Sequence, residues 1–182
     1  KLNKNIIRLN CIGRYTFQKG QLELIKIISN LENINYELNF YGRGSLAQQM
    51  EEGILKYRQV SKMNLKNSTN LDDIYNDADI IIINSQYEGQ SNVFLECLEF
   101  GKPMIINERL KKELLEIYGE SILAFIVFFN DTNEIQKFLQ KITSDEEYLK
   151  EILKEQKNFA LKYENEFQTI DKYYLDLKKD SK

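Results

Sequence analysis

The chain has 182 residues, of which 42% are hydrophobic and 29% are charged, a composition typical of a folded globular domain with its own core. Its formal net charge of -3 lacks the basic excess that nucleic-acid or anionic-membrane partners usually require. The sequence contains no histidine, which removes Ser-His and Cys-His catalysis and the commonest metal ligand. We expect the two cysteines, Cys11 and Cys97, to be buried in apolar surroundings rather than bonded to each other or to a metal.

Strand-like and helix-like segments alternate along the chain. Strands are predicted at residues 6–12, 36–41, 60–65, 79–84, 104–106 and 123–129. Helices are predicted at residues 18–31, 45–57, 71–76, 92–100, 109–118 and 132–143, followed by a highly charged helical region with breaks from Asp145 onward. This alternation predicts an α/β domain built as a Rossmann-like parallel sheet with helices on both faces.

No apolar run reaches the length of a membrane span, and no signal peptide is visible before the first strand-like run. Because the chain begins with Lys1 rather than Met, we expect it to be part of a longer protein. We assign residues 1–163 to one domain. The helix expected at residues 164–182 exceeds what the core needs, so we expect it to pack toward another domain.

Glycines, cations and carboxylates follow several of the predicted strands. Ligands of open parallel sheets bind beyond the carboxyl ends of the strands, so the loops there are where a site is expected. Arg14 and Lys19 follow the first strand, and two cations beside a helix N-terminus would hold a diphosphate. The alternative is a pair of solvated loop cations. The pattern differs from a P-loop because Lys19 precedes its glycine and no Ser or Thr follows.

Gly42-Arg43-Gly44 follows the second predicted strand. The two glycines either let a ligand approach the backbone closely or simply form a tight turn into a helix. Both interpretations remain open for this segment.

Two glutamates, Glu88 and Glu96, lie eight positions apart around the start of the helix predicted at residues 92–100. Ser91 or Asn92 is expected to cap that helix and to leave backbone N–H groups open toward the cleft, where a phosphate would bind. Carboxylates repel a phosphate but accept hydrogen bonds from hydroxyls, so the site resembles a place for a ribose, a diphosphate and a sugar. The alternative is that Glu96 interacts with the helix dipole and Glu88 is solvated.

Asp77-Ala78-Asp79 has the spacing of a carboxylate metal site. It precedes the strand predicted at residues 79–84 and so belongs at the opposite edge of the sheet. We therefore predict no metal site there.

These residues fall in stretches that resemble the C-terminal, nucleotide-sugar-binding domain of retaining GT-B glycosyltransferases of family 4. The stretch SQYEGQSNVFLECLEFGKPMI is similar to the segment of that family that carries Glu-x7-Glu, here Glu88 and Glu96. IGRYTFQKG is similar to its Gly-Arg…Lys-Gly segment, FYGRGS to its Gly-x-Gly turn, and LDDIYNDADIIIINS to the lead-in to the main motif. The resemblance covers residues 6–143. Cys97 stands where alanine is usual, and residues 107–118 lack the usual Gly-rich turn and Pro-Glu, for which Glu108 or Glu113 could substitute.

The resemblance implies a hexosyltransferase-type enzyme that transfers a sugar from a UDP- or GDP-sugar to an acceptor with retention, in bacterial surface polysaccharide or glycoconjugate synthesis. It implies no metal and no other cofactor. Glu88, Arg14 and Lys19 would be the catalytic residues, and Glu96 would take the ribose hydroxyls. The implied donor-binding residues are Gly13, Arg14, Lys19, Gly42, Gly44, Glu88, Gly89, Gln90, Ser91, Asn92 and Glu96.

The acceptor half of that family comes from an N-terminal domain that this chain lacks. We therefore expect a donor half that is inactive alone, located in the cytoplasm and, through the missing domain, at the inner face of the membrane, with no nucleic-acid partner. The alternative is a non-catalytic α/β nucleotide-binding or interaction module, which the unusual residues 107–118 and the charged C-terminal helix motivate.

Overall fold

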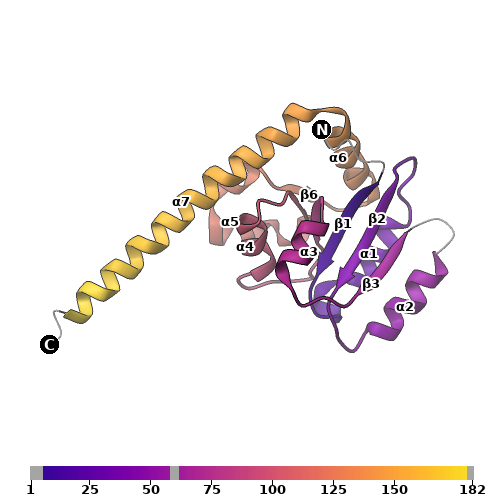
Figure 1. The fold of residues 1–182 in the computed structure, drawn as a ribbon, viewed down its shortest axis with the longest axis horizontal. Coiled ribbons are helices and arrows are strands. Elements are labelled where there is room, and N and C mark those ends of the chain that lie inside the picture. The colour runs from indigo at the N-terminus through magenta and orange to yellow at the C-terminus, as the bar shows by residue number, and fades with distance from the viewer. Residues whose placement is uncertain (1–5, 58–61, 180–182) are drawn as a thin grey trace.

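The computed structural model describes residues 6–57 and 62–179, with side chains described as far as Glu164. Its strands form one parallel sheet of six in the order β3-β2-β1-β4-β5-β6 (Figure 1). The strands are β1 (Ile7–Ile12), β2 (Tyr36–Tyr41), β3 (Met63–Lys66), β4 (Ile80–Ile83), β5 (Met104–Asn107) and β6 (Val127–Phe129). The helices are η1 (Phe17–Lys19), α1 (Gln21–Ile28), α2 (Ala47–Lys56), α3 (Leu71–Asp77), α4 (Asn92–Glu99), η2 (Glu108–Leu110), α5 (Lys111–Tyr118), η3 (Glu120–Ala124), α6 (Thr132–Ser144) and α7 (Glu146–Lys179).

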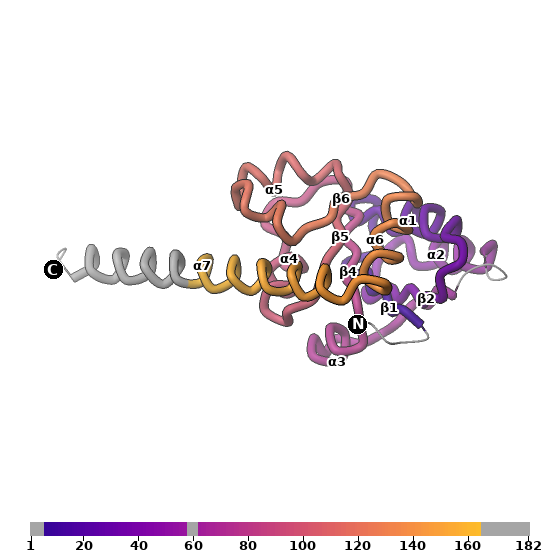
Figure 2. The backbone as a smooth tube through the Cα atoms, turned by 90° about the horizontal axis from the view of Figure 1, so that it is seen from above, coloured from indigo at the N-terminus to yellow at the C-terminus, as the bar shows by residue number. Residues whose placement is uncertain are grey.

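Helices cover both faces of the sheet, which confirms the Rossmann-like fold. Figure 2 shows α1, α2 and α6 on one side of the strands and α3, α4 and α5 on the other. The chain leaves β1 toward one edge of the sheet and leaves β4 toward the other. Because β1 and β4 are neighbours, their following loops border the crevice in which sheets of this kind bind ligands.

The central strand β4 is apolar throughout, and each of its four isoleucines is buried. A strand that is covered by helices on both faces has apolar side chains at every position, and the run of isoleucines predicted such a strand. On the neighbouring half of the sheet, Asn10, Asn39 and Asn64 lie opposite one another on β1, β2 and β3. Asn39 donates to Asn10 at 3.3 Å and Asn64 donates to Asn39 at 3.0 Å. A shift of one residue would leave these amides unpaired, so the row of asparagines helps to set the strand register.

One predicted strand is wrong in its first half. Residues 123–129 were expected to be extended, but η3 occupies residues 120–124 and only Val127–Phe129 pairs with β5. The N–H groups of Phe125 and Ile126 donate to the carbonyl of Ile122 at 3.2 and 3.0 Å, which closes a turn before the strand begins. Ile122 is fully buried in that turn. A short apolar run buries its side chains equally well as a turn or as a strand, so periodicity does not separate the two.

The C-terminal region is a single helix, α7, without the predicted breaks. It starts beside α6 and crosses to α4 (Figure 2), where the Gln156 amide donates to the carbonyls of Cys97 and Lys102 at 2.8 and 3.0 Å. Phe159 joins an aromatic cluster with Tyr118 and Phe125. The domain boundary expected between residues 163 and 164 falls inside α7.

Some predictions fall partly outside the described residues. The strand predicted at residues 60–65 is seen as β3, while residues 60 and 61 lie outside the described part. The packing expected of residues 164–182 concerns side chains that are described only for Glu164. Within the described part of the chain, no helix is both long and apolar enough to cross a bilayer.

Candidate functional site

The loops that follow β1 and β4 are locked together at the crevice between these strands. The N–H of Gln86 donates to the carbonyl of Gln18 at 2.6 Å, and the Gln18 amide donates to the carbonyl of Tyr87 at 3.2 Å. Gly20 has a φ of 64° and lies so close to Asn84 that any Cβ would clash with the Asn84 backbone. Glycine at this position therefore allows the two loops to meet.

Lys19 and Glu88, one from each loop, form an ion pair in this crevice. The Lys19 Nζ lies 2.5 Å from the Glu88 Oε1, and the Ser85 hydroxyl donates to the same oxygen at 2.5 Å. The Glu88 side chain is only 8% exposed and that of Lys19 is 18% exposed. The stem of Lys19 passes over Gly13, where an added Cβ would lie 3.2 Å from it. Lys19, which is predicted to bind the diphosphate, and Glu88, which is predicted to face the sugar, are thus direct partners of each other.

Arg14, the other predicted cation, is exposed on the same loop. Its carbonyl accepts a hydrogen bond from the Gln21 amide at 3.0 Å, which anchors the backbone there. Among the residues that the structure describes, no side chain forms an ion pair with the Arg14 guanidinium. The guanidinium is therefore accessible to an anionic ligand.

Gly42 and Gly44 fit against the loop that follows β1. A Cβ at Gly42 would clash with the carbonyl of Gly13, and one at Gly44 would clash with the backbone of Tyr15. The N–H of Tyr15 donates to the carbonyl of Arg43 at 2.9 Å, so the two loops are joined through their backbones. Loop packing accounts for both glycines, and their role in donor binding stays a prediction.

The turn before α4 is open. Ser91 is the N-cap, and its hydroxyl accepts a hydrogen bond from the N–H of Phe94 at 3.4 Å. Gln90 and Asn92 are exposed, and no other residue lies within 4 Å of the position where Gly89 would carry a Cβ. An anion that binds at a helix N-terminus requires an accessible turn of this kind.

Glu96 lies about one turn inside α4 and has a different partner from Glu88. Its Oε2 accepts a hydrogen bond from the Tyr75 hydroxyl of α3 at 2.5 Å. Tyr75 is fully buried, and its ring stacks on that of Phe100 with centroids 4.6 Å apart. Glu96 is half-buried, and in the described part of the chain it shares no hydrogen-bond partner with Glu88.

Sequence reasoning did not assign Ser85 or Tyr75 to the site, and it left Glu113 as one of two candidates. The structure distinguishes these candidates, because Glu113 accepts a hydrogen bond from the backbone N–H of Glu88 at 3.1 Å. Glu108 instead pairs with Lys111 at 2.9 Å. The signal for Glu113 was its place in the unusual segment after β5, but no spacing indicated which loop it would reach.

Arg109 ties the loops after β4 and β5 to α1. Its Nη2 lies 2.8 Å from the Glu23 Oε1, and its Nη1 donates to the Gln86 side-chain oxygen at 2.5 Å. Burial acts to raise the pKa of Glu23, but the Arg109 guanidinium, together with hydrogen bonds from the Gln86 and Asn84 amides, holds that pKa below its ordinary value. This network holds Gln86, two residues before Glu88 in the same loop.

The aspartates of Asp77-Ala78-Asp79 and the two cysteines play structural roles. Asp77 accepts a hydrogen bond from the Tyr41 hydroxyl at 3.1 Å, and Asp79 accepts one from the N–H of Arg8 at 2.9 Å. Among the side chains described in residues 6–57 and 62–164, no group of three His, Cys, Asp or Glu is placed to hold a metal ion. Cys11 and Cys97 are buried free thiols as predicted, and burial raises the pKa of Cys11 to about 12.

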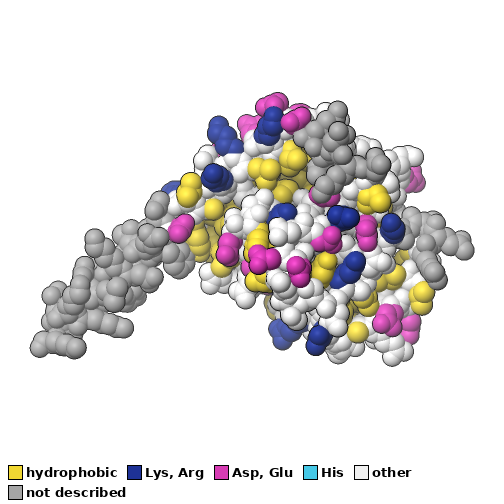
Figure 3. Space-filling view, in the orientation of Figure 1, with side chains coloured by type: hydrophobic (Ala, Val, Ile, Leu, Met, Phe, Trp, Pro, Cys, Tyr) yellow, Lys and Arg dark blue, Asp and Glu magenta, His cyan; other side chains and the backbone are white. Residues whose placement is uncertain are grey.

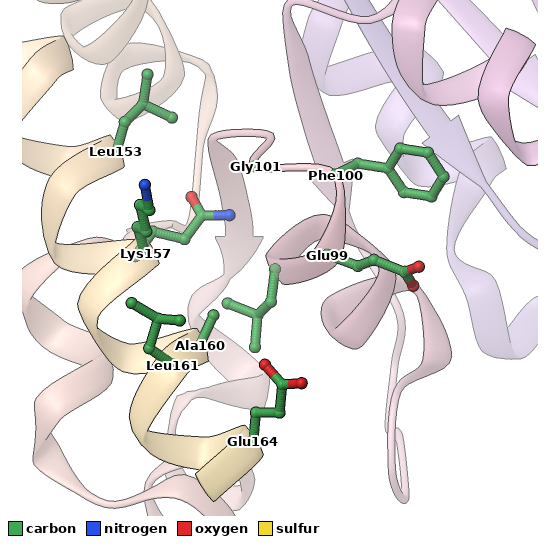
Figure 4. A pocket seen from close by; sticks show the side chains of 10 residues that line it. Glu99, Phe100, Gly101, Leu153, Lys157, Ala160, Leu161 and Glu164 are labelled. Atoms are coloured by element: carbon green, nitrogen blue, oxygen red, sulfur yellow. The ribbon is translucent and has the colours of Figure 1, made fainter.

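A cavity of about 550 Å³ lies away from the predicted site, between α4 and α7 (Figure 4). Glu99, Phe100 and Gly101 border it on one side, and residues of α7 from Leu153 to Glu164 border it on the other. None of the predicted site residues lines this cavity.

Figure 3 shows acidic and basic side chains intermixed on one face of the molecule, so the described residues on that face form no continuous basic area.

The fold, a six-stranded parallel Rossmann-like sheet with helices on both faces, matches part of the GT-B glycosyltransferase fold. The sequence matches the family Glycosyl transferases group 1 over residues 1–159, and the chain belongs to this family.

Two curated relatives are glycosyltransferases. One, an uncharacterized glycosyltransferase of Methanocaldococcus jannaschii, is 28% identical over 140 residues, which cover 74% of this chain and 35% of the relative. The other, the amylovoran biosynthesis glycosyltransferase AmsD of Erwinia amylovora, is 28% identical over 99 residues, which cover 54% of this chain and 28% of the relative. The chain thus matches 35% and 28% of the length of these relatives.

Solved structures share the fold at low identity. A TarM mutant of S. aureus in complex with Fondaparinux, alpha-GlcNAc-glycerol and UDP has a TM-score of 0.72 and 16% identity, with 87% of this chain and 33% of that chain covered. Anabaena HepE in complex with UDP-glucose has a TM-score of 0.69 and 15% identity, with 86% of this chain and 44% of that chain covered. The C-terminal domain of LpcC from Francisella tularensis has a TM-score of 0.67 and 16% identity, with 86% and 85% covered.

Proposed function

We propose that this chain is the donor-binding half of a retaining GT-B glycosyltransferase of family 4, which transfers a hexose from a nucleotide-diphosphate sugar to an acceptor. The observation that carries the proposal is the meeting of Lys19 and Glu88 at the crevice between β1 and β4, beside the open turn that precedes α4. A cation, an acid and a helix N-terminus at one place suit a ligand that carries both phosphates and hydroxyls.

The comparisons support a nucleotide-sugar donor. The TarM structure holds UDP and the HepE structure holds UDP-glucose, and both have this fold. The LpcC structure is of a C-terminal domain, and this chain covers 85% of it. Together with the short match to the curated relatives, this supports a chain that supplies the donor half, while an N-terminal domain supplies the acceptor half. AmsD is named for amylovoran biosynthesis, which supports a polysaccharide setting. A location in the bacterial cytoplasm at the membrane face is part of the same proposal.

Each residue takes a role that follows from its charge and place. Arg14 and Lys19 hold the diphosphate and, with the N-terminus of α4, stabilise the negative charge that develops on the leaving group. Lys19 exchanges its partner Glu88 for phosphate oxygens, which leaves the Glu88 carboxylate available to hydroxyls of the donor sugar. Glu96 accepts the ribose hydroxyls, and the backbone from Gly89 to Asn92 contacts sugar and phosphate. These cations and the helix terminus supply the positive charge, so we propose that no metal ion or other cofactor is needed.

Isothermal titration calorimetry of the 182-residue chain with UDP, GDP and ADP tests the proposal. We expect one of the three to bind with a Kd on the order of micromolar, since two cations and a helix terminus converge on the diphosphate. A folded sample, verified by circular dichroism, that binds none of the three would contradict the proposal. Thermal-shift screening with nucleotide sugars then identifies the sugar, because a ligand of the native state raises its melting temperature.

A further inference from the structure

The hydrogen bond between Tyr75 and Glu96 joins two helices at the proposed ribose end of the site. Tyr75 comes from α3 and Glu96 from α4, and the hydroxyl lies 2.5 Å from the Glu96 Oε2. The Tyr75 ring stacks on Phe100, the C-cap of α4, with an interplanar angle of 6°. Tyr75 thus contacts α4 at two places. Its ring packs on Phe100 at the C-terminal end of the helix, and its hydroxyl binds Glu96, one turn earlier.

This contact restricts one oxygen of Glu96 and leaves the other for a ligand. A half-exposed glutamate on a helix samples several rotamers, and a hydrogen bond to a rigid buried partner removes most of them. Within the described part of the chain, no hydrogen bond engages the Glu96 Oε1. A carboxylate anchored in this way presents its second oxygen in one direction before the ligand arrives.

The chemistry of the partner also suits a site that takes a diphosphate. Burial above all raises the pKa of the Tyr75 hydroxyl, so it remains a neutral donor at physiological pH. A lysine in its place would neutralise Glu96, and a second acid would repel the phosphates. Tyrosine orients the carboxylate and leaves its charge unchanged.

We propose that Tyr75 is a positioning residue, which orients Glu96 toward the 2′- and 3′-hydroxyls of the donor nucleotide and thereby favours ribonucleotides over their dideoxy counterparts. This inference rests on the proposed function, because it requires Glu96 to face the ribose. It extends that function to a residue of α3 that is fully buried.

A purely structural role for Tyr75 makes a different prediction. If Tyr75 only holds α3 against α4, its substitution would lower the stability of the fold and would weaken the binding of every nucleotide equally. A positioning role affects only ligands that carry the hydroxyls that Glu96 accepts. The two roles therefore separate when two ligands that differ only in those hydroxyls are compared.

The experiment is calorimetry of Tyr75→Phe with UDP and with 2′,3′-dideoxy-UDP. Phenylalanine keeps the stacked ring and removes only the hydroxyl. We expect the affinity for UDP to fall about tenfold, the effect of one hydrogen bond to a charged group. The affinity for the dideoxy compound should stay within about twofold of that of the native chain, because that ligand has no hydroxyls for Glu96 to accept.

Two controls accompany the variant. Tyr36→Phe removes another buried tyrosine hydroxyl, which donates to the carbonyl of Ile28 at 2.8 Å at the start of β2, and should leave both affinities unchanged. In a Glu96→Ala background, Tyr75→Phe should not weaken UDP binding any further, because the effects of substituting two residues that act through one another are not additive.

Each result decides the matter. Equal losses for UDP and the dideoxy compound, or no loss for either, would overturn the role of Tyr75 while the proposed function stands. An additive loss in the Glu96→Ala background would also overturn it. If the folded native chain binds none of UDP, GDP and ADP, the proposed function fails and this inference fails with it. If GDP or ADP binds in place of UDP, the same comparison is made with that nucleotide and its dideoxy form.

Discussion

The regions around Glu88 and Glu96 contain the same acidic residue in two different environments. Glu88 lies in a loop, is 8% exposed and pairs with a cation, Lys19. Glu96 lies on a helix, is half-buried and pairs with a neutral hydroxyl, that of Tyr75. The partner of Glu88 is a group that an anionic ligand would compete for, whereas the partner of Glu96 is not. In the proposed site, the Glu88 end would therefore have to rearrange to bind a diphosphate, whereas the Glu96 end is already assembled.

Lys19→Met should give the largest effect, because Lys19 belongs to both the folded chain and the proposed diphosphate site. The variant leaves the buried Glu88 carboxylate without its cation, which should lower the free energy of unfolding by about 3 kcal/mol. The affinity for UDP should fall about a hundredfold. Urea denaturation and calorimetry measure the two effects.

The double variant Lys19→Met/Glu88→Gln is the matched control for that experiment. Glutamine removes the unpaired charge, so the double variant should recover most of the lost stability and none of the lost affinity. A double variant that binds UDP as well as the native chain would remove Lys19 from the diphosphate site.

Arg14→Ala should have an intermediate effect that is confined to binding. Arg14 is exposed, so the free energy of unfolding should change by less than about 0.5 kcal/mol. The affinity for UDP should fall about tenfold, and more at low salt than at high salt. Lys112→Ala, which removes another exposed cation on α5, is the control and should leave UDP binding unchanged. Equal affinities for Arg14→Ala and the native chain would show that Arg14 does not face the phosphates.

Glu88→Gln should give the smallest effect on binding, and with the opposite sign. UDP would no longer compete with a carboxylate for Lys19, so we expect its affinity to rise about threefold. Glu96→Gln should instead weaken UDP. In the full-length enzyme, Glu88→Gln should abolish sugar transfer, measured with the nucleotide sugar found by screening. A loss of UDP affinity in both glutamate variants would contradict the distinction between the two ends of the site.

The order of strands and helices was predictable because apolar periodicity reports which residues must face a core. Residues 79–84 could be read as a strand buried on both faces, since their run of isoleucines suits a strand covered on both faces. Residues 123–126 were misread as part of a strand, since a compact turn buries Phe125 and Ile126 as well as a strand would. The continuity of helix α7 was harder to predict, because a highly charged sequence is compatible both with one long helix and with several shorter ones.

The sequence by itself determined which residue types follow which strand, and parallel strands bring all those positions to one edge of the sheet. Lys19 and Glu88 could therefore be assigned to one site although they are 69 residues apart. Only the tertiary structure decided that they pair with each other, that Glu113 holds the N–H of Glu88, and that Tyr75 reaches Glu96. Such partnerships depend on loop conformation, side-chain rotamers and the packing of one helix on another, none of which leaves a period or a fixed spacing in the sequence.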